Sequence, residues 1–169
     1  MASFSASEMA ALHHARELLL GRGLAVLAAW ALLNLIVGGT ALARADRRQS
    51  GYYFYGMCVG WGVVNACLAF WGIWNWHPRP PVGLHLADLV QAQLANENLF
   101  SLNTGLDVAY VMTGFYLRAL AAVPGQLKSA RLFGFGQALW VQGGFLLVFD
   151  AVMWVVLHWQ GKQWLPALL

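Results

Sequence analysis

Charged residues are scarce in this sequence. Only 10% of the 169 residues are Asp, Glu, Lys or Arg, whereas 60% are hydrophobic. Soluble domains carry about a quarter charged residues, so the composition excludes an ordinary soluble protein. The formal net charge of +3 comes from basic residues spread over the chain, with no run dense enough to bind nucleic acid. We therefore expect the lipid bilayer, and not nucleic acid, to be the main partner.

Catalytic signatures are also missing. The chain contains no HExxH, no GxSxG and no Gly-rich phosphate loop. Its two cysteines, Cys58 and Cys67, are nine residues apart and so lie on opposite sides of a helix, which excludes a disulfide between them. The histidines fall outside or at the ends of the hydrophobic runs, which argues against a haem held by two buried histidines. These absences favour a protein that is not an enzyme, and no cofactor is expected.

Four hydrophobic runs dominate what remains. They cover about residues 24–43, 54–76, 99–123 and 136–158. Each is long enough, at about 1.5 Å per residue, to cross a hydrocarbon core of about 30 Å. The pattern predicts an all-α fold, a four-span transmembrane helix bundle that forms a single membrane domain over residues 1–169.

Two shorter amphipathic segments flank these runs. Ser5 and Glu8 have the spacing of a capping box, and residues 1–20 predict an N-terminal amphipathic helix at the membrane interface. Residues 83–96 alternate apolar and polar side chains but are too short and too polar to span. They predict an interfacial helix between spans two and three. Basic residues favour a cytoplasmic location for the loops after spans one and three, with both termini outside.

A polar side chain recurs inside each predicted span. The candidate site residues are Asp107, Asp150, Asn65, Asn34, Asn103 and Tyr110. An aspartate in the bilayer centre costs about 2.5 to 3.5 kcal/mol on insertion scales, so it must be compensated. Asp107 and Asp150 each lie about eight residues from the same side of the membrane. We expect the six side chains to converge in the centre of the bundle.

Several functions fit this polar layer. It serves packing alone if each carboxyl is protonated or paired with an Asn, Tyr or Trp donor. It is a binding or transport site if Asp107 and Asp150 hold a proton, a cation or a small cationic ligand beside aromatic rings. It belongs to a membrane-embedded metal-dependent enzyme if the carboxyls act with His77, His85 or His158. Alternatively, Trp-rich and Gly-rich faces dock the chain into a homo-oligomer or, as an accessory subunit, into a larger membrane complex.

Four sequence segments carry a family resemblance. They are residues 30–34 (WALLN) with the glycine pair 38–39, residues 60–61 (GW) with 63–65 (VVN), residues 103–110 and residues 142–150. Together they resemble an uncharacterised family of small four-helix bacterial integral membrane proteins. The resemblance implies a multi-pass protein of the bacterial inner membrane and no known activity.

Overall fold

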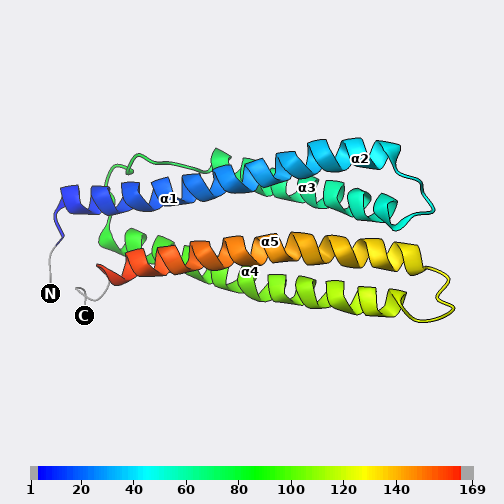
Figure 1. Ribbon diagram of the computed structural model, residues 1–169. Helices are drawn as coiled ribbons and strands as arrows, with labels where there is room; N and C mark the ends of the chain where they lie inside the picture. The colour runs from blue at the N-terminus through cyan, green and yellow to red at the C-terminus, as the bar shows by residue number, and fades with distance from the viewer. Residues whose placement is uncertain (1–3, 165–169) are drawn as a thin grey trace.

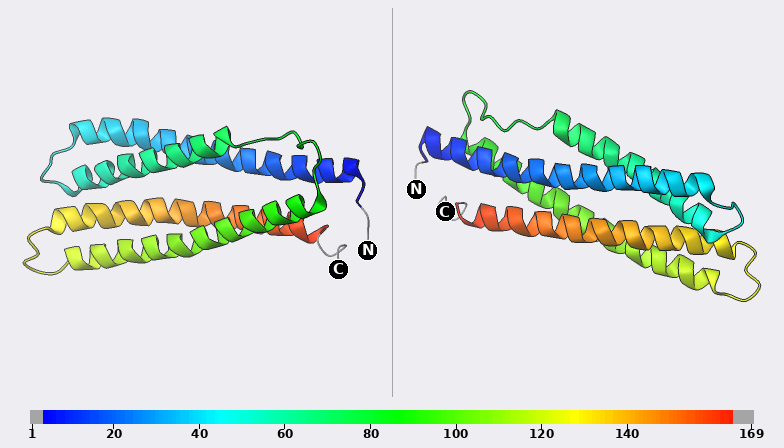
Figure 2. Two further views of the ribbon diagram at one scale, coloured as in Figure 1. Left: turned by 180° about the vertical axis from the view of Figure 1, so that it is seen from behind. Right: turned by 45° about the horizontal axis from the view of Figure 1, so that its top comes forward.

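The computed structural model describes residues 4–164, and every regular element in that range is helical. The elements are α1 (Ala6–Leu33), a π-helical turn η1 (Asn34–Gly38), α2 (Gly39–Arg44), α3 (Ser50–Trp74), α4 (Leu86–Ala121) and α5 (Ser129–Lys162). They form four long rods that lie side by side, and α1 begins at the end of the bundle where α5 ends (Figure 1). The rods pair into two hairpins, α1–α3 and α4–α5, which Figure 2 shows from two further directions.

The first rod begins at the predicted capping box. The Ser5 hydroxyl accepts the backbone N–H of Glu8 at 3.3 Å, and the Glu8 carboxylate accepts the backbone N–H of Ser5 at 2.7 Å. From there the chain is helical from Ala6 to Arg44, through the π-helical turn. The prediction of a separate N-terminal helix is therefore wrong. The residues around the two glycines near position 22 are strong helix formers, and they carry the helix through.

The second hairpin shows a similar fusion of two predicted segments. After α3, residues 75–85 contain three prolines and form an irregular connection. The backbone N–H of His85 then donates to the Asp88 carboxylate at 3.0 Å, where α4 begins. No Gly or Pro follows until Gly105, so nothing interrupts the helix. The prediction of an interfacial helix separate from span three is wrong, because both belong to α4.

Three helices in the described part of the chain are long and apolar enough to cross a membrane. They are Ala6–Arg44, Ser50–Trp74 and Ser129–Lys162. They include the predicted spans one, two and four. The helix α4 is not among them, because polar residues recur along its whole length, including Asn103, Asp107 and Arg118 in its second half.

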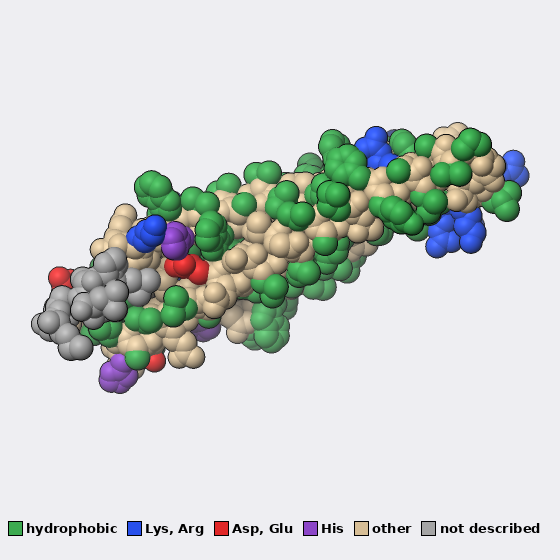
Figure 3. Space-filling model, turned by 90° about the horizontal axis from the view of Figure 1, so that it is seen from below, with side chains coloured by type: hydrophobic (Ala, Val, Ile, Leu, Met, Phe, Trp, Pro, Cys, Tyr) green, Lys and Arg blue, Asp and Glu red, His purple; other side chains and the backbone are tan. Residues whose placement is uncertain are grey.

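Compared with a soluble protein, this protein has an apolar exterior and polar side chains in its interior. Large apolar side chains such as Phe70, Trp71 and Val148 are 64% to 69% exposed. On the face drawn in Figure 3, charged side chains gather at the two ends, and hydrophobic side chains cover the middle. Amide side chains are buried instead, with Asn65 and Gln142 at most 1% exposed. This arrangement is that of a protein whose middle faces lipid.

Glycines bring α4 and α5 into close contact. A Cβ atom added to Gly114 would lie 2.7 Å from the carbonyl oxygen of Gly136, and one added to Gly136 would lie 2.7 Å from the carbonyl oxygen of Gly114. Gly143 extends the contact, since its Cβ would lie 3.0 Å from the Cβ of Tyr110. The next residue, Gly144, faces open space.

The two hairpins meet mainly through one helix of each. α3 packs along both α1 and α5, whereas the backbones of α3 and α4 make almost no contact. The bundle is therefore open along the line between α3 and α4. This opening determines where a cavity can form.

Candidate functional site

Asp107 of α4 and Asp150 of α5 face each other inside the second hairpin. Their side chains are almost completely buried, at 3% and 5% exposure. The two carboxyl groups lie close enough to interact with each other, and the side-chain amide of Asn103 lies near Asp150. Ionised carboxylates only accept hydrogen bonds, so Asp107 and Asp150 can bond to each other only where one of them carries a proton. The predicted convergence of the two acids is present in the structure.

A cavity of about 550 Å³ lies beside this pair, between α3, α4 and α5. Its polar lining consists of Asn65, Asn103, Asp107, Tyr110 and Asp150. The rest of the lining is apolar or glycine. Small-molecule sites typically measure about 300 to 1,000 Å³ and combine apolar walls with a few polar groups. Five of the six predicted site residues therefore line one cavity of small-molecule size.

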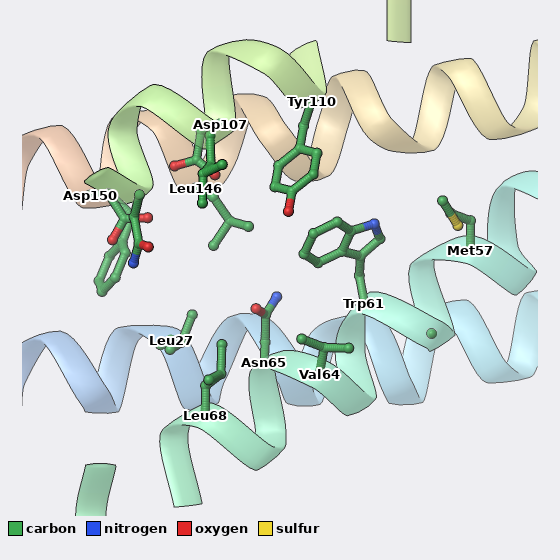
Figure 4. A pocket seen from close by; sticks show the side chains of 14 residues that line it. Leu27, Met57, Trp61, Val64, Asn65, Leu68, Asp107, Tyr110, Leu146 and Asp150 are labelled. Atoms are coloured by element: carbon green, nitrogen blue, oxygen red, sulfur yellow. The ribbon is translucent and has the colours of Figure 1, made fainter. Parts of the chain in front are cut away.

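Two buried polar atoms on the cavity wall lack a partner among residues 4–164. They are Nδ2 of Asn65 and, in the ionised carboxylate, Oδ2 of Asp107. In Figure 4 the Asn65 amide projects from α3 into the cavity, and Asp107 and Asp150 lie on the opposite wall. A buried polar group left without a hydrogen bond costs about 1 to 3 kcal/mol. The cavity thus presents a donor and an acceptor that a bound molecule would satisfy.

Aromatic rings close the cavity beyond the carboxyl pair. The edge of one ring of the pair Trp61 and Tyr110 meets the face of the other, with their centroids 5.1 Å apart. This contact bridges α3 and α4 across the line where their backbones stay apart. Nearer to the acids, Leu27, Leu146 and Phe149 supply apolar walls.

The cavity opens sideways, between α3 and α4. Its rim includes Val64 and Leu68 of α3, which are 48% and 56% exposed, and Leu106 of α4, which is 47% exposed. These exposed rim side chains are apolar, so the cavity is reached through an apolar opening.

Asn34 lies outside this cavity, so the expected convergence of all six side chains is wrong for this residue. Its Nδ2 donates to the Trp30 carbonyl at 2.8 Å, and its Oδ1 accepts from Gln142 Nε2 at 2.6 Å. Gln142 Oε1 in turn accepts from the Trp30 indole at 2.9 Å. Gln142 precedes Asp150 by eight residues on α5, which is about 12 Å along the helix. The Asn34 cluster is therefore at a different depth from the acids.

Sequence reasoning missed Gln142 although the sequence contained a signal. Gln142, Leu146 and Asp150 follow one another at intervals of four residues, which places them on one face of a helix. Asp150 is one of the side chains expected to point into the bundle, so a glutamine on the same face has to be hydrogen-bonded in the interior. Gln142 is 0% exposed.

The three histidines considered as metal ligands do not reach the carboxyl pair. His158 pairs with Glu97 at 2.9 Å, and the His77 ring donates to the backbone carbonyl of Asn75 at 2.7 Å. His85 is exposed at the start of α4. Across the described range 4–164, no three His, Cys, Asp or Glu side chains are grouped so as to hold a metal ion. The geometry thus offers metal-dependent chemistry no support.

A second polar cluster, near the end where α1 begins, was not predicted. Arg16 is only 6% exposed, and its guanidinium lies 3.3 Å from His13 and 3.4 Å from Glu17. The neighbouring Gln93 is 1% exposed and donates to the Leu157 carbonyl at 2.6 Å and to Glu97 at 2.8 Å. In the amphipathic segments 1–20 and 83–96, polar side chains are expected on the exposed face of each helix. The pattern carries no information on how α1, α4 and α5 meet, so it could not predict this cluster.

One comparison with known proteins gives a match. The sequence model of a family of unknown function, DUF6992, matches residues 26–151. The matched range contains Asn65, Asp107 and Asp150, and it leaves out most of the polar cluster around Arg16. No curated protein and no solved structure matches the chain.

Proposed function

We propose that this chain, which belongs to DUF6992, a family of unknown function, binds a positive charge at the Asp107–Asp150 pair. The charge is a proton or the cationic group of a small ligand. The protein that carries this site is a four-span protein of a bacterial inner membrane.

The fourth span of this proposal is α4. It lies alongside α5 over most of its length, which supports a membrane crossing by both helices. The buried polar residues of α4, Gln93 and Asp107, point into the bundle. Its outer face is apolar over the half that was expected to span, with exposed side chains at Leu99, Leu102, Leu106, Val108, Met112 and Phe115. The polar residues that lower the mean hydropathy of α4 are thus compatible with a lipid-facing exterior.

The carboxyl pair is the observation that carries the proposal. Two ionised carboxylates in contact repel each other strongly where the dielectric constant is low, so a positive charge between them is strongly favoured. Packing alone does not account for the site, because a layer that only specifies packing would close around its polar groups. Here a cavity of about 550 Å³ remains beside them, with Asn65 Nδ2 and Asp107 Oδ2 unpaired among residues 4–164.

The bacterial inner membrane is proposed from the family resemblance of the spans. The basic loops support an orientation with residues 45–49 and 122–128 in the cytoplasm. In that orientation the carboxyl pair lies nearer the outer side than the cytoplasmic side.

A thermal denaturation series tests the carboxyl pair. Wild type, Asp107→Asn and Asp150→Asn are compared in detergent between about pH 4 and about pH 9. We expect the wild type to lose stability as the pH rises, because deprotonation of both acids places two like charges close together in a buried site. Each Asn variant carries one carboxyl fewer and should show a smaller pH dependence.

Asp46→Asn is the matched control, because Asp46 is exposed in the loop between α2 and α3. Its side chain accepts the backbone N–H of Arg48 at 2.9 Å, a bond that asparagine can also form. The control should follow the wild-type pH profile. If Asp107→Asn and Asp150→Asn follow it as well, the pair binds no titrating charge and the proposal fails.

A further inference from the structure

We infer that the ligand of this cavity is a small amine with an apolar body and a hydrogen-bond acceptor, which enters from the bilayer between α3 and α4. This inference rests on the proposed function, because it names the molecule that carries the positive charge. The size of the cavity, its two unpaired atoms and its rim define the ligand.

The volume of the cavity decides between a bare ion and an organic cation. A water molecule occupies about 30 Å³, so a cavity of about 550 Å³ is far larger than a proton or a monatomic cation requires. Hard metal cations such as Ca²⁺ take about six to eight oxygen ligands. Here the carboxylate oxygens lie on one wall, the Asn65 amide lies on the opposite wall, and Leu27, Leu146 and Phe149 cover much of the rest. An organic cation fills the apolar part as well as the charged part.

The carboxyl pair selects a protonated amine with N–H groups to donate. Asp107 and Asp150 offer acceptors at one end of the cavity, and Oδ2 of ionised Asp107 has no donor within residues 4–164. A primary ammonium group donates up to three hydrogen bonds, as a lysine side chain does, whereas a quaternary ammonium group donates none. The rings of Trp61 and Tyr110 lie on the cavity wall and add a surface that favours cations.

Asn65 determines the second polar feature of the ligand. Its Nδ2 is a buried donor on the wall formed by α3, opposite the acids. A ligand that satisfies it must carry an acceptor, such as an ether or hydroxyl oxygen, at some distance from its ammonium group. An alkyl amine without such an oxygen leaves this donor unpaired and binds less tightly.

The rim determines the route. Val64, Leu68 and Leu106 are apolar and about half exposed on the lipid-facing surface. An amphiphilic amine concentrates in the bilayer and reaches this opening from the side. The same rim disfavours small inorganic cations, which stay in water.

The test compares probes that differ in one group, on the full chain purified in detergent. Phenoxybutylamine carries an ammonium group, an ether oxygen and an aromatic body. In phenoxybutanol a hydroxyl replaces the amine, and in phenylpentylamine a methylene replaces the ether oxygen. We expect phenoxybutylamine to bind at one site per chain, at least about tenfold more tightly than the alcohol and several-fold more tightly than phenylpentylamine. Binding is measured by equilibrium dialysis with radiolabelled probe.

Variants assign the two polar contacts. Asp150→Asn should weaken phenoxybutylamine by at least about tenfold, whereas Asp46→Asn should leave it unchanged. Asn65→Leu should abolish the preference for the ether over phenylpentylamine and keep the preference for amine over alcohol. If Asp150→Asn does not fold, the amine–alcohol and ether–methylene comparisons on the wild type still decide.

The outcomes separate this inference from the proposed function. If the pH-dependent stability is present but the amine binds no better than the alcohol, the pair holds a proton and the inference is overturned. Equal binding of amine and alcohol to every variant would mean partition into detergent, and it would overturn the inference as well. If both the pH dependence and the amine preference are missing, the proposed function fails with it.

Discussion

At the scale of single residues, Gln142 is a fully buried amide that must find its hydrogen-bond partners inside the protein. It is 0% exposed, it donates to Asn34 and it accepts from the Trp30 indole, so it joins α5 to the first rod by two hydrogen bonds. One side chain thus connects α5 to the first rod inside the bundle, where water is not available to replace its bonds.

Replacing Gln142 by Ala should destabilise the protein by about 1 to 3 kcal/mol, because it leaves the Asn34 carbonyl oxygen and the Trp30 N–H unpaired. Single hydrogen bonds between membrane helices average only about 0.6 kcal/mol, so the lower half of that range is expected. The measurement is the midpoint of thermal or denaturant unfolding in detergent. Gln91→Ala, at an exposed position on α4, serves as the control and should change little. Equal effects of the two substitutions would contradict a structural role for the cluster.

The polar residues show what a sequence can and cannot reveal at this scale. Burial of Asp107, Asp150 and Asn65 follows from hydropathy, because a polar side chain in an apolar run must point inward. Their partners do not follow. Asn34 fits the same rule, yet it bonds to Gln142 and not to the acids, because depth in the bundle depends on how far one helix slides along another.

At the scale of helices, the glycines of α4 and α5 determine how closely the second hairpin packs. Gly114 and Gly136 lie backbone to backbone, so an added methyl group meets a carbonyl oxygen that cannot move aside. Gly105 and Gly144 lie on the same two helices, but no atom lies within 4 Å of a Cβ added there. The chain therefore provides test and control positions on each helix.

We expect Gly114→Ala and Gly136→Ala to destabilise the protein by about 1 to 3 kcal/mol, the usual cost of overpacking. Gly105→Ala and Gly144→Ala should be neutral or stabilising by up to about 1 kcal/mol, because alanine has the higher helix propensity. Unfolding midpoints in detergent give both values. A loss of stability at Gly105 or Gly144 as large as that at Gly114 would show that helix flexibility, and not close packing, is what the glycines provide.

The helices also show where sequence patterns stop being informative. Hydrophobic runs located three helices that are long and apolar enough to span, and the Ser5 capping box marked the first helical turn correctly. The patterns wrongly divided α1 and α4 into an amphipathic and a spanning part. A helix can change from an amphipathic to an apolar pattern along its length without ending. Only helix-breaking residues, such as the prolines of residues 75–85, indicate where a helix ends.

At the scale of the whole molecule, the cavity results from the way in which the two hairpins meet. α3 rests on α5 and leaves α4 apart from α3, so the polar faces of three helices line a space that opens between α3 and α4. This space was not predictable from the sequence. Each helix contributes an ordinary buried stripe, and the gap depends on which pair of helices makes the contact between the hairpins.

The proposed site requires that α4 crosses the membrane. The loops before and after α4 must then lie on opposite sides of the membrane. Val82 precedes α4 and Leu127 follows it, and both side chains are essentially fully exposed, at 106% and 99%. If α4 spans, Val82→Cys and Leu127→Cys lie on opposite sides. In intact cells a membrane-impermeant maleimide should label Val82→Cys, whereas Leu127→Cys should react only after permeabilisation, because the basic loops favour the cytoplasm.

The native cysteines set the background of this experiment. Cys58 is buried, and Cys67 is exposed on a helix that is apolar enough to span, so neither should react with a reagent confined to water. The unsubstituted chain is therefore the control and should remain unlabelled. Labelling of both introduced cysteines from one side would mean that α4 does not cross. The carboxyl pair would then lie outside the hydrocarbon core, and lateral entry of a ligand from lipid would lose its basis.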